Sequence, residues 1–295
     1  MLRVDFYATT ESEQLPAAGE ASWYIRSQYD GTPWEEVFER FMRTVDTTQV
    51  TDLSIGYWGL HDTVDTFASD KLIEVADRFP ALRALFIGDM SSEDCDISSL
   101  WHAELTPVFT VFPKLERFEV RGSESSMLRP FRSETLRTLR IESGGLEGDV
   151  VQAVAASDLP NLEHLDIWLG DPNYGGDATV ADLAPILGGQ RLPALRHLGL
   201  EDSVLQDEIA AAVAGAPVVA RLESLSLAMG TLTDQGAEAL LAGQPLTHLR
   251  RLDLRHHFLS DAMMERVQAA LPGVEVDMMY RNLADDGIYY IEVAE

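Results

Sequence analysis

Two similar segments of the chain each carry a histidine at the same place, with acidic residues and a tryptophan close by. Residues 162–167 read LEHLDI and residues 195–200 read LRHLGL. Imidazole and carboxylate groups suit zinc or a similar divalent ion, whereas a tryptophan beside polar groups is typical of a protein-binding hot spot. The segments therefore indicate either a metal centre or a binding surface. The side chains concerned are His164, Asp166, Trp168, His197 and Glu201.

A metal centre is the less favoured of these two interpretations. The two segments offer only two histidines, no helix-spaced ligand motif accompanies them, and side chains on flat strands seldom converge on a tetrahedral point. We therefore expect no metal ion, no other cofactor and no catalytic residue. A metal-dependent enzyme at His164 and His197 stays as an alternative.

Both segments are copies of one apolar frame, L-x-x-L-x-L, that recurs eight times. The last two apolar positions alternate as in a strand, and the intervening segments show helical periodicity. Prolines such as Pro160 and Pro193 stand two residues before a frame and end the preceding helix. Alternating strands and helices predict right-handed crossovers and a parallel sheet. The frames are residues 50–55, 82–87, 115–120, 136–141, 162–167, 195–200, 222–227 and 249–254.

This pattern resembles the leucine-rich repeat, in the long form with full helices found in ribonuclease-inhibitor-like proteins. The resemblance implies a single-domain α/β solenoid, or horseshoe, with a parallel concave sheet, outer helices and terminal caps. We expect an N-terminal cap over residues 1–49, eight to nine repeats over residues 50–276, and a C-terminal cap over residues 277–295. Only 21 residues separate Leu115 from Leu136, which leaves room for little helix there.

One position departs from the leucine-rich-repeat pattern. Three residues after each frame the family usually has Asn or Cys, whose side chain ties adjacent loops together. Here a regular asparagine ladder is not expected. The residues at that position are Trp58, Met90, Ser123, Gly144, Gly170, Ser203, Gly230 and His257.

Over its whole length the chain also resembles a largely actinobacterial leucine-rich-repeat family. The stretches behind this resemblance include DTTQVTDLSIGYWG, FPALRALFIGDM, VAASDLPNLEHLDIWLG and LTHLRRLDLRHHFLS. Genes of that family tend to lie beside genes for radical-SAM enzymes. The resemblance thus implies a second alternative, an accessory or substrate-presenting subunit for a modifying enzyme.

Both ends of the chain lie outside the regular frames. Residues 23–28 predict a short strand and residues 32–45 a helix. After the last helix, residues 274–277 predict a final strand and residues 278–287 a polar connection. The segment 288–293, IYYIEV, predicts a strand that covers the C-terminal end of the sheet.

In such a frame, the residues that flank the last two apolar positions face the concave side. There Arg121 neighbours Glu142, and Arg140 lies between acidic residues, which predicts a self-neutralising charge ladder. Gly199 is expected to leave a gap beside Trp168 that a partner could fill. The loop 168–178 would extend the same surface. We therefore expect a protein partner to contact His164, Asp166, Trp168, His197, Glu201, Arg140, Glu142, Asn173 and Tyr174.

The amino-acid composition indicates which kind of partner and which cellular compartment to expect. The 49 acidic and 22 basic residues give a formal charge of −27, which disfavours nucleic acid and anionic membranes and favours a basic protein. The lone Cys95 cannot form an intrachain disulfide, and no apolar run has the length of a membrane span, so a cytoplasmic protein is expected. Common hydrolase, nucleotide-binding and zinc-protease motifs do not occur, so we do not expect an enzyme. Nothing in the sequence indicates an oligomeric state.

Overall fold

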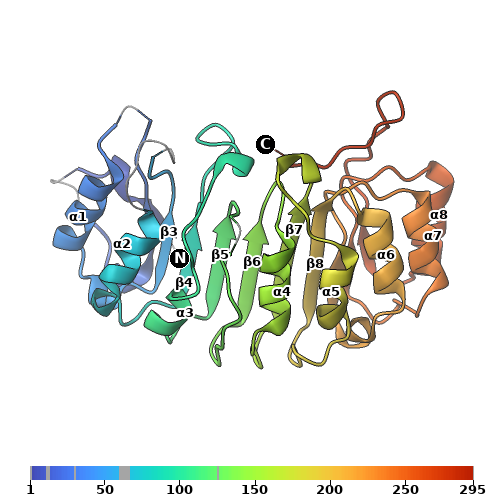
Figure 1. The fold of residues 1–295 in the computed structure, drawn as a ribbon, viewed down its shortest axis with the longest axis horizontal. Coiled ribbons are helices and arrows are strands. Elements are labelled where there is room, and N and C mark those ends of the chain that lie inside the picture. Colours follow the sequence, from blue (N-terminus) through green and yellow to red (C-terminus); the bar gives the residue numbers. More distant parts are fainter. Residues whose placement is uncertain (1, 11–13, 30, 60–66, 125, 295) are drawn as a thin grey trace.

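The computed structural model describes residues 2–10, 14–29, 31–59, 67–124 and 126–294. Within these ranges the chain forms one open sheet of eleven parallel strands that follow one another in sequence order. Figure 1 shows the strands side by side in a curved row with helices covering one face. The chain is an α/β leucine-rich-repeat-like solenoid, as the sequence predicts.

Each of the eight predicted frame strands forms, and neighbouring strands pair in register. Parallel pairing of strands that follow one another requires a crossover on one side of the sheet, and the intervening segments supply it. The strands are β1 (Leu2–Asp5), β2 (Ala21–Ile25), β3 (Asp52–Ile55), β4 (Ala84–Ile87), β5 (Arg117–Arg121), β6 (Thr138–Glu142), β7 (His164–Gly170), β8 (His197–Ser203), β9 (Ser224–Ser226), β10 (Arg251–Asp253) and β11 (Glu275–Asp277).

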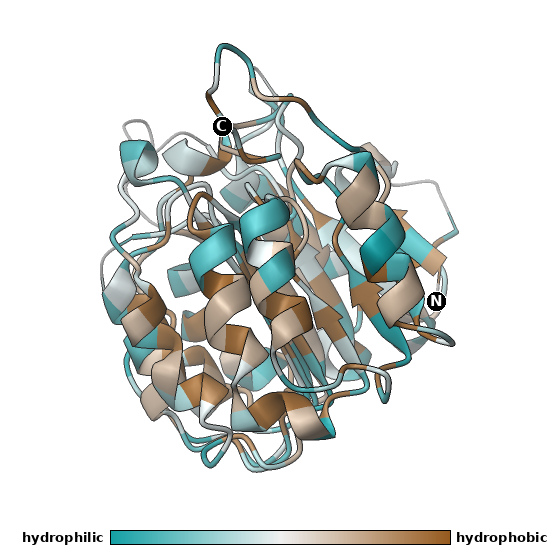
Figure 2. Cartoon of the chain, turned by 90° about the vertical axis from the view of Figure 1, so that its right-hand side faces the viewer, coloured by the Kyte–Doolittle hydropathy of each residue, from teal (hydrophilic) through white to brown (hydrophobic). Residues whose placement is uncertain are grey.

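The helices form the outer layer, and the core lies between them and the sheet. In β8, Leu198 and Leu200 are fully buried, as is Leu195 just before it, while α6 buries Ile209 and Val213 against the same layer. Figure 2 shows such apolar residues on both layers. The helices are α1 (Trp34–Thr44), α2 (Ala68–Glu74), α3 (Val108–Val111), α4 (Gly148–Ala156), α5 (Val180–Leu187), α6 (Gln206–Ala214), α7 (Asp234–Ala242) and α8 (Asp261–Ala270).

The repeats are less regular in the first half of the described chain. Among the described residues between β5 and β6 no helix forms, as the short spacing there predicts, and α3 between β4 and β5 is a single turn. At the N-terminus, β2 and α1 confirm the predicted strand and helix, but β1 was not predicted. The eleven strands of the sheet are thus the eight frame strands, the predicted β2 and β11, and the unpredicted β1.

His257 occupies one of the positions where leucine-rich repeats usually have Asn or Cys, and it joins adjacent loops. Its Nε2 lies 3.0 Å from the carbonyl oxygen of Met278, and its Nδ1 accepts from the N–H of Leu259 at 3.1 Å. None of the helices in the described ranges has the length and apolar character needed to cross a bilayer.

The strand predicted over residues 288–293 does not form. Residues 288–294, called the C-terminal tail below, instead run back over the carboxyl ends of the strands. The N–H of Glu292 donates to the carbonyl of Met229 at 2.8 Å, and the N–H of Val293 donates to Asp202 Oδ1 at 3.0 Å. A Cβ at Gly144 would lie 2.5 Å from the carbonyl oxygen of Ala294, so the tail reaches the turn after β6. Figure 1 shows this course toward the middle of the array.

Candidate binding site on the concave face

Two histidines and one aspartate meet at the centre of the concave face. His164 and Asp166 lie two residues apart on β7 and so share a face, and His197 on β8 pairs in register with His164. His164 Nε2 lies 2.6 Å from Asp166 Oδ2, and His197 Nε2 lies 2.7 Å from Asp166 Oδ1. The two imidazole rings stack with centroids 3.9 Å apart. We call these three residues the His–Asp–His cluster.

Asp166 is buried, with 7% of its surface exposed, and its charge depends on the two imidazoles. Burial alone would raise the pKa of this carboxyl, but the hydrogen bonds from His164 and His197 outweigh burial and lower the pKa well below its usual range. The cluster therefore holds a carboxylate that accepts a hydrogen bond on each oxygen.

Gly199 is what allows Asp166 to reach across to β8. It pairs in register with Asp166, and a Cβ built on it would lie only 2.1 Å from Asp166 Oδ1. The expectation that Gly199 leaves a gap for a partner is therefore wrong, because the Asp166 carboxylate fills that space.

Ser224 on β9 extends the cluster into a chain of hydrogen-bonding groups. Its hydroxyl lies 2.6 Å from His197 Nδ1, so Ser224, His197 and Asp166 are linked in the order used by serine hydrolases. A hydrolase also needs donors that stabilise the oxyanion. The N–H of Ser224 is used by the carbonyl of Arg196, and Arg251, its neighbour on β10, is paired with Asp253 and Asp277. The arrangement orients His197, and these two candidate donors beside Ser224 are already engaged.

Trp168 does not have the exposure expected of a binding hot spot. Only 5% of it is exposed, and it packs with Ile97, Met229 and the tail residue Val293 in a small apolar cluster. The Arg140 guanidinium lies 5.4 Å from the centre of its ring. Trp168 therefore helps to hold the C-terminal tail and is not available to a partner.

Glu201, beside Trp168, is also buried. Its carboxylate accepts from the indole N–H of Trp168 at 2.9 Å and from the hydroxyl of Ser226. Burial and the nearby charge of Asp166 raise the pKa of Glu201, and these hydrogen bonds only partly offset that. Glu201 thus forms part of the floor of the site.

Glu142 lies between two arginines: Arg121 pairs with it across the strands, as the charge ladder predicts, whereas Arg140 pairs with it along β6. Arg121 Nε donates to Glu142 Oε2 at 2.6 Å, and Arg140 Nε lies 2.8 Å from Glu142 Oε1, close enough for an ion pair although not aligned for a hydrogen bond. Glu142 is 3% exposed. We call these three residues the Arg–Glu–Arg cluster.

A hollow of about 350 Å³ opens over these strands. Its acidic groups lie deep, whereas the side chains of Arg140, His164 and Arg251 are 36%, 40% and 43% exposed. The exposed rim is thus rich in hydrogen-bond donors. Its lining includes His197, Ser224, Ser226, Met229, Asp253 and Arg255 besides the residues already named.

Asn173 and Tyr174 do not line this hollow. They belong to a short 3-10 turn, Pro172–Tyr174, after β7, in which the N–H of Asn173 donates to Asp171 Oδ1 at 2.8 Å. Tyr174 lines a separate hollow of about 250 Å³ with Trp101 and Glu147. The structure therefore does not place this loop with the His–Asp–His cluster.

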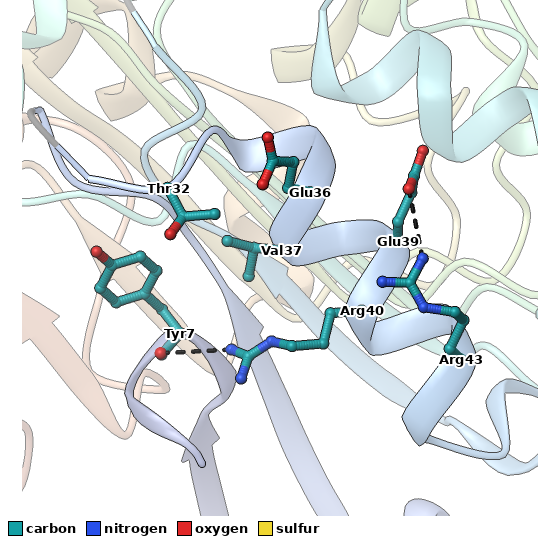
Figure 3. Close-up of a pocket in the computed structure, with 7 residues that line it drawn as sticks. All are labelled: Tyr7, Thr32, Glu36, Val37, Glu39, Arg40 and Arg43. Carbon is teal, nitrogen blue, oxygen red and sulfur yellow. Dashed lines mark hydrogen bonds and ion pairs between the residues drawn. The ribbon is translucent and has the colours of Figure 1, made fainter. Parts of the chain in front are cut away.

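A hollow of about 650 Å³ beside α1 is a weaker candidate. Figure 3 shows that its cationic side chains are already engaged: Arg40 points to the backbone carbonyl of Tyr7, and Arg43 meets Glu39. Arg40 also donates to the carbonyl of Phe6 at 2.9 Å, so it ties α1 to the first turn of the chain.

Sequence reasoning missed an exposed apolar segment near the C-terminus. The stretch expected to be a polar connection carries Met279, Tyr280 and Leu283, which are 55%, 65% and 73% exposed. Tyr289 and Tyr290 continue it and pack edge-on against Phe258. The aromatic content of residues 278–290 was the available signal.

No protein-family model matches the chain, and no curated protein matches it in sequence. Among solved structures it is similar to a crystal structure of a Bacteroides fragilis protein from the Northeast Structural Genomics Consortium, with a TM-score of 0.82 and 26% identity. The match covers 91% of this chain and 77% of that one. The description of that protein gives no ligand or activity, so the similarity supports the solenoid fold.

Proposed function

We propose that the protein binds a partner protein through its concave face, with the hollow over β7–β10 at the centre of the contact. The observation that carries this proposal is the lining of the hollow. Its polar side chains are fixed by one another, as His197 is by Asp166 and Ser224, while the leucines beneath belong to the core. A rigid polar surface over an independent core can bind without disturbing the fold.

The concave sheet is long enough for a stable interface. Eleven strands spaced by about 4.8 Å give a surface on the order of 48 Å long. Specific interfaces bury about 800 Å² on each partner. The hollow would supply the centre of such a contact, and the neighbouring strands its rim.

The charge of the chain favours a basic partner. With a formal charge of −27, the chain attracts cationic surfaces over long distances. On the concave face the acidic groups lie beneath arginines, so we expect this attraction to raise the association rate more than to form direct ion pairs.

Burial and Asp96 raise the pKa of the Cys95 thiol, which fits an unreactive cysteine in a reducing cytoplasm.

Ser224→Trp tests the proposal, because an indole in column with His197 would fill the hollow and a strand accommodates tryptophan. The matched control is Glu208→Trp on the outer face of α6. Proteins captured by each bait would be quantified, and the specific partner remeasured with purified chains at two salt concentrations. We expect a partner that Glu208→Trp retains and Ser224→Trp loses. Retention of every captured protein by Ser224→Trp would contradict a concave binding site.

The resemblance to the actinobacterial leucine-rich-repeat family suggests one partner class to try first. A radical-SAM enzyme would be assayed with and without this chain, and a rate increase that Ser224→Trp removes would identify an accessory or substrate-presenting subunit. No contact in the structure selects this enzyme class over another partner.

A further inference from the structure

We propose that His164, Asp166 and His197 bind one divalent first-row transition-metal ion through two imidazole nitrogens and one carboxylate oxygen. This revises the expectation from the sequence, which rested on the difficulty of bringing ligands on flat strands together. Within the part of the chain that the structure describes, this is the one group of three possible metal-ligating side chains whose ligand atoms lie within 4.8 Å of one another.

The three side chains converge because they come from two adjacent strands and because one of them leans across. The in-register pairing of His164 with His197 brings two imidazoles together, and both turn Nε2 toward the same carboxylate. Nitrogen ligands at 2.0–2.1 Å from a tetrahedral ion are roughly 3.3 Å apart. Each imidazole Nε2 therefore has to move away from its Asp166 oxygen by about 0.6 Å, and the most widely spaced ligand atoms have to close by no more than about 1.5 Å. Rotation of the imidazoles about their side-chain bonds can supply both movements.

One supporting contact of the kind that metal-ligating histidines make is already present. A ligating histidine usually bonds its second ring nitrogen to a neighbouring polar group, which fixes the ring. His197 does so through Nδ1, which lies 2.6 Å from the Ser224 hydroxyl. A hydroxyl can donate or accept, so Ser224 can serve the tautomer that leaves Nε2 free for a metal. Gly199 gives Asp166 the space to lie between the two strands.

The site is open on one side. The side chains of His164 and His197 are 40% and 20% exposed, and both line the hollow, which gives an ion a path from solvent. Three protein ligands leave at least one coordination position free toward the hollow. A ligand from water or from a bound partner could complete it.

The donor set defines the class of ion. Two imidazoles and one carboxylate suit Zn²⁺, Fe²⁺ and similar ions, whereas Ca²⁺ and Mg²⁺ prefer oxygen ligands alone. Zn²⁺ is the probe of choice because it is redox-inert and binds such sites tetrahedrally.

The test is calorimetric titration of Zn²⁺ into the full-length, tag-free, chelator-treated chain, without any partner. We expect one ion per chain for the wild type. His164→Ala with His197→Ala should abolish this binding, and His248→Ala, an exposed histidine elsewhere, should leave it unchanged. Ser224→Ala should weaken it by about 10–100-fold, because only a supporting group is lost.

His164→Gln, at the more exposed of the two histidines, serves if the double variant fails to fold. Co²⁺ provides a second readout, since its visible absorption changes when imidazole nitrogens coordinate it. No stoichiometric binding by the wild type, or binding that survives in the folded double or His164→Gln variant, would overturn the proposal. Because no partner is present, this result is independent of the protein-binding function.

Discussion

The Arg–Glu–Arg and His–Asp–His clusters lie on neighbouring strands of one concave face and share one design. In each, a buried carboxylate joins two nitrogen-bearing side chains, one on its own strand and one on an adjacent strand. Glu142 joins Arg121 and Arg140, and Asp166 joins His164 and His197. The difference is chemical. Guanidinium groups stay protonated and cannot ligate a metal, whereas imidazoles can lose a proton and offer a lone pair.

The comparison shows that one arrangement of side chains on adjacent strands can hold either a permanent ion-pair cluster or the set of groups that we propose as a metal site. Around Glu142 the carboxylate charge is compensated by two guanidinium groups that stay protonated. Around Asp166 the same positions are filled by groups that can exchange their protons for an ion. The Arg–Glu–Arg cluster on β5 and β6 therefore keeps its charges, whereas the imidazoles of the His–Asp–His cluster on β7 and β8 are the groups that we propose to bind an ion.

The largest effect is expected for Glu142→Gln, which leaves two guanidinium groups facing a neutral amide. Removing one member of a buried ion pair costs up to 3–5 kcal/mol, and because both arginines are about one-third exposed we expect a loss of about 2–3 kcal/mol. Urea unfolding would measure it. Asp166→Asn should cost only about 1 kcal/mol, because an asparagine amide can still accept a hydrogen bond from one imidazole and donate to the other.

Glu163→Gln is the control for this comparison, since its partner Arg137 and Glu163 itself are both more than half exposed. Its cost should stay below about 1 kcal/mol. An equal loss for Asp166→Asn and Glu142→Gln would show that the two clusters respond alike and would remove the distinction drawn between them.

Asp202 on β8 extends the comparison to a carboxyl group for which the described part of the chain provides no cationic partner. Burial raises its pKa to about 8, although the backbone N–H groups of Val293 and Glu292 in the tail lower it somewhat. Between pH 4 and 8 the carboxyl group of Asp202 therefore holds a proton in the native state that it does not hold in the unfolded chain. Stability should fall as the pH rises through this range, and level off above about pH 8.

Asp202→Asn should remove this pH dependence, because an amide keeps an acceptor for the N–H of Val293 without charge. Asparagine also tolerates the left-handed backbone here, where φ is 51°. At pH 9 we expect it to stabilise the chain by about 1–2 kcal/mol, since the tail can undock rather than let the full cost of the charge accrue. Thermal unfolding between pH 5 and 9 would measure it. If the stability of Asp202→Asn depended on pH in the same way as that of the wild type and of the exposed control Asp77→Asn, the raised pKa of Asp202 would be contradicted.

The sequence could predict the fold because its strands are specified locally. Leu195, Leu198 and Leu200 repeat a spacing that recurs in every frame, and a parallel solenoid is the arrangement that buries all of them. The strand β1 escaped prediction because LRVD carries no frame. The strand predicted at residues 288–293 failed because the tail bonds to the end of β8 and to the turn after β9, and such long-range contacts leave no local pattern.

The juxtaposition of the side chains in the His–Asp–His cluster could be predicted from the sequence, but their burial and contacts could not. Register followed from the frame, so His164, Asp166 and His197 were expected side by side. Whether Trp168 is exposed depends on the returning tail, and whether Asp166 leans toward β8 depends on the direction of one side chain. Neither is encoded in residue type or spacing.

The smallest effect on stability, and the sharpest test of the His–Asp–His cluster, is expected for Gly199→Ala. The backbone of Gly199 does not have a positive φ, so alanine fits the strand, but its Cβ would displace the Asp166 carboxylate. We expect a change below about 1 kcal/mol in unfolding free energy, because only the flexible end of one side chain must move. The Zn²⁺ affinity should nevertheless fall by about 10–100-fold, as all three ligands remain but one is misplaced.

Gly215→Ala, whose Cβ would meet nothing within 4 Å, is the matched control and should keep full affinity. Equal affinity in both variants would mean that the space at Gly199 does not hold the carboxylate in place, and the distinction from the Arg–Glu–Arg cluster would then depend on the imidazoles alone.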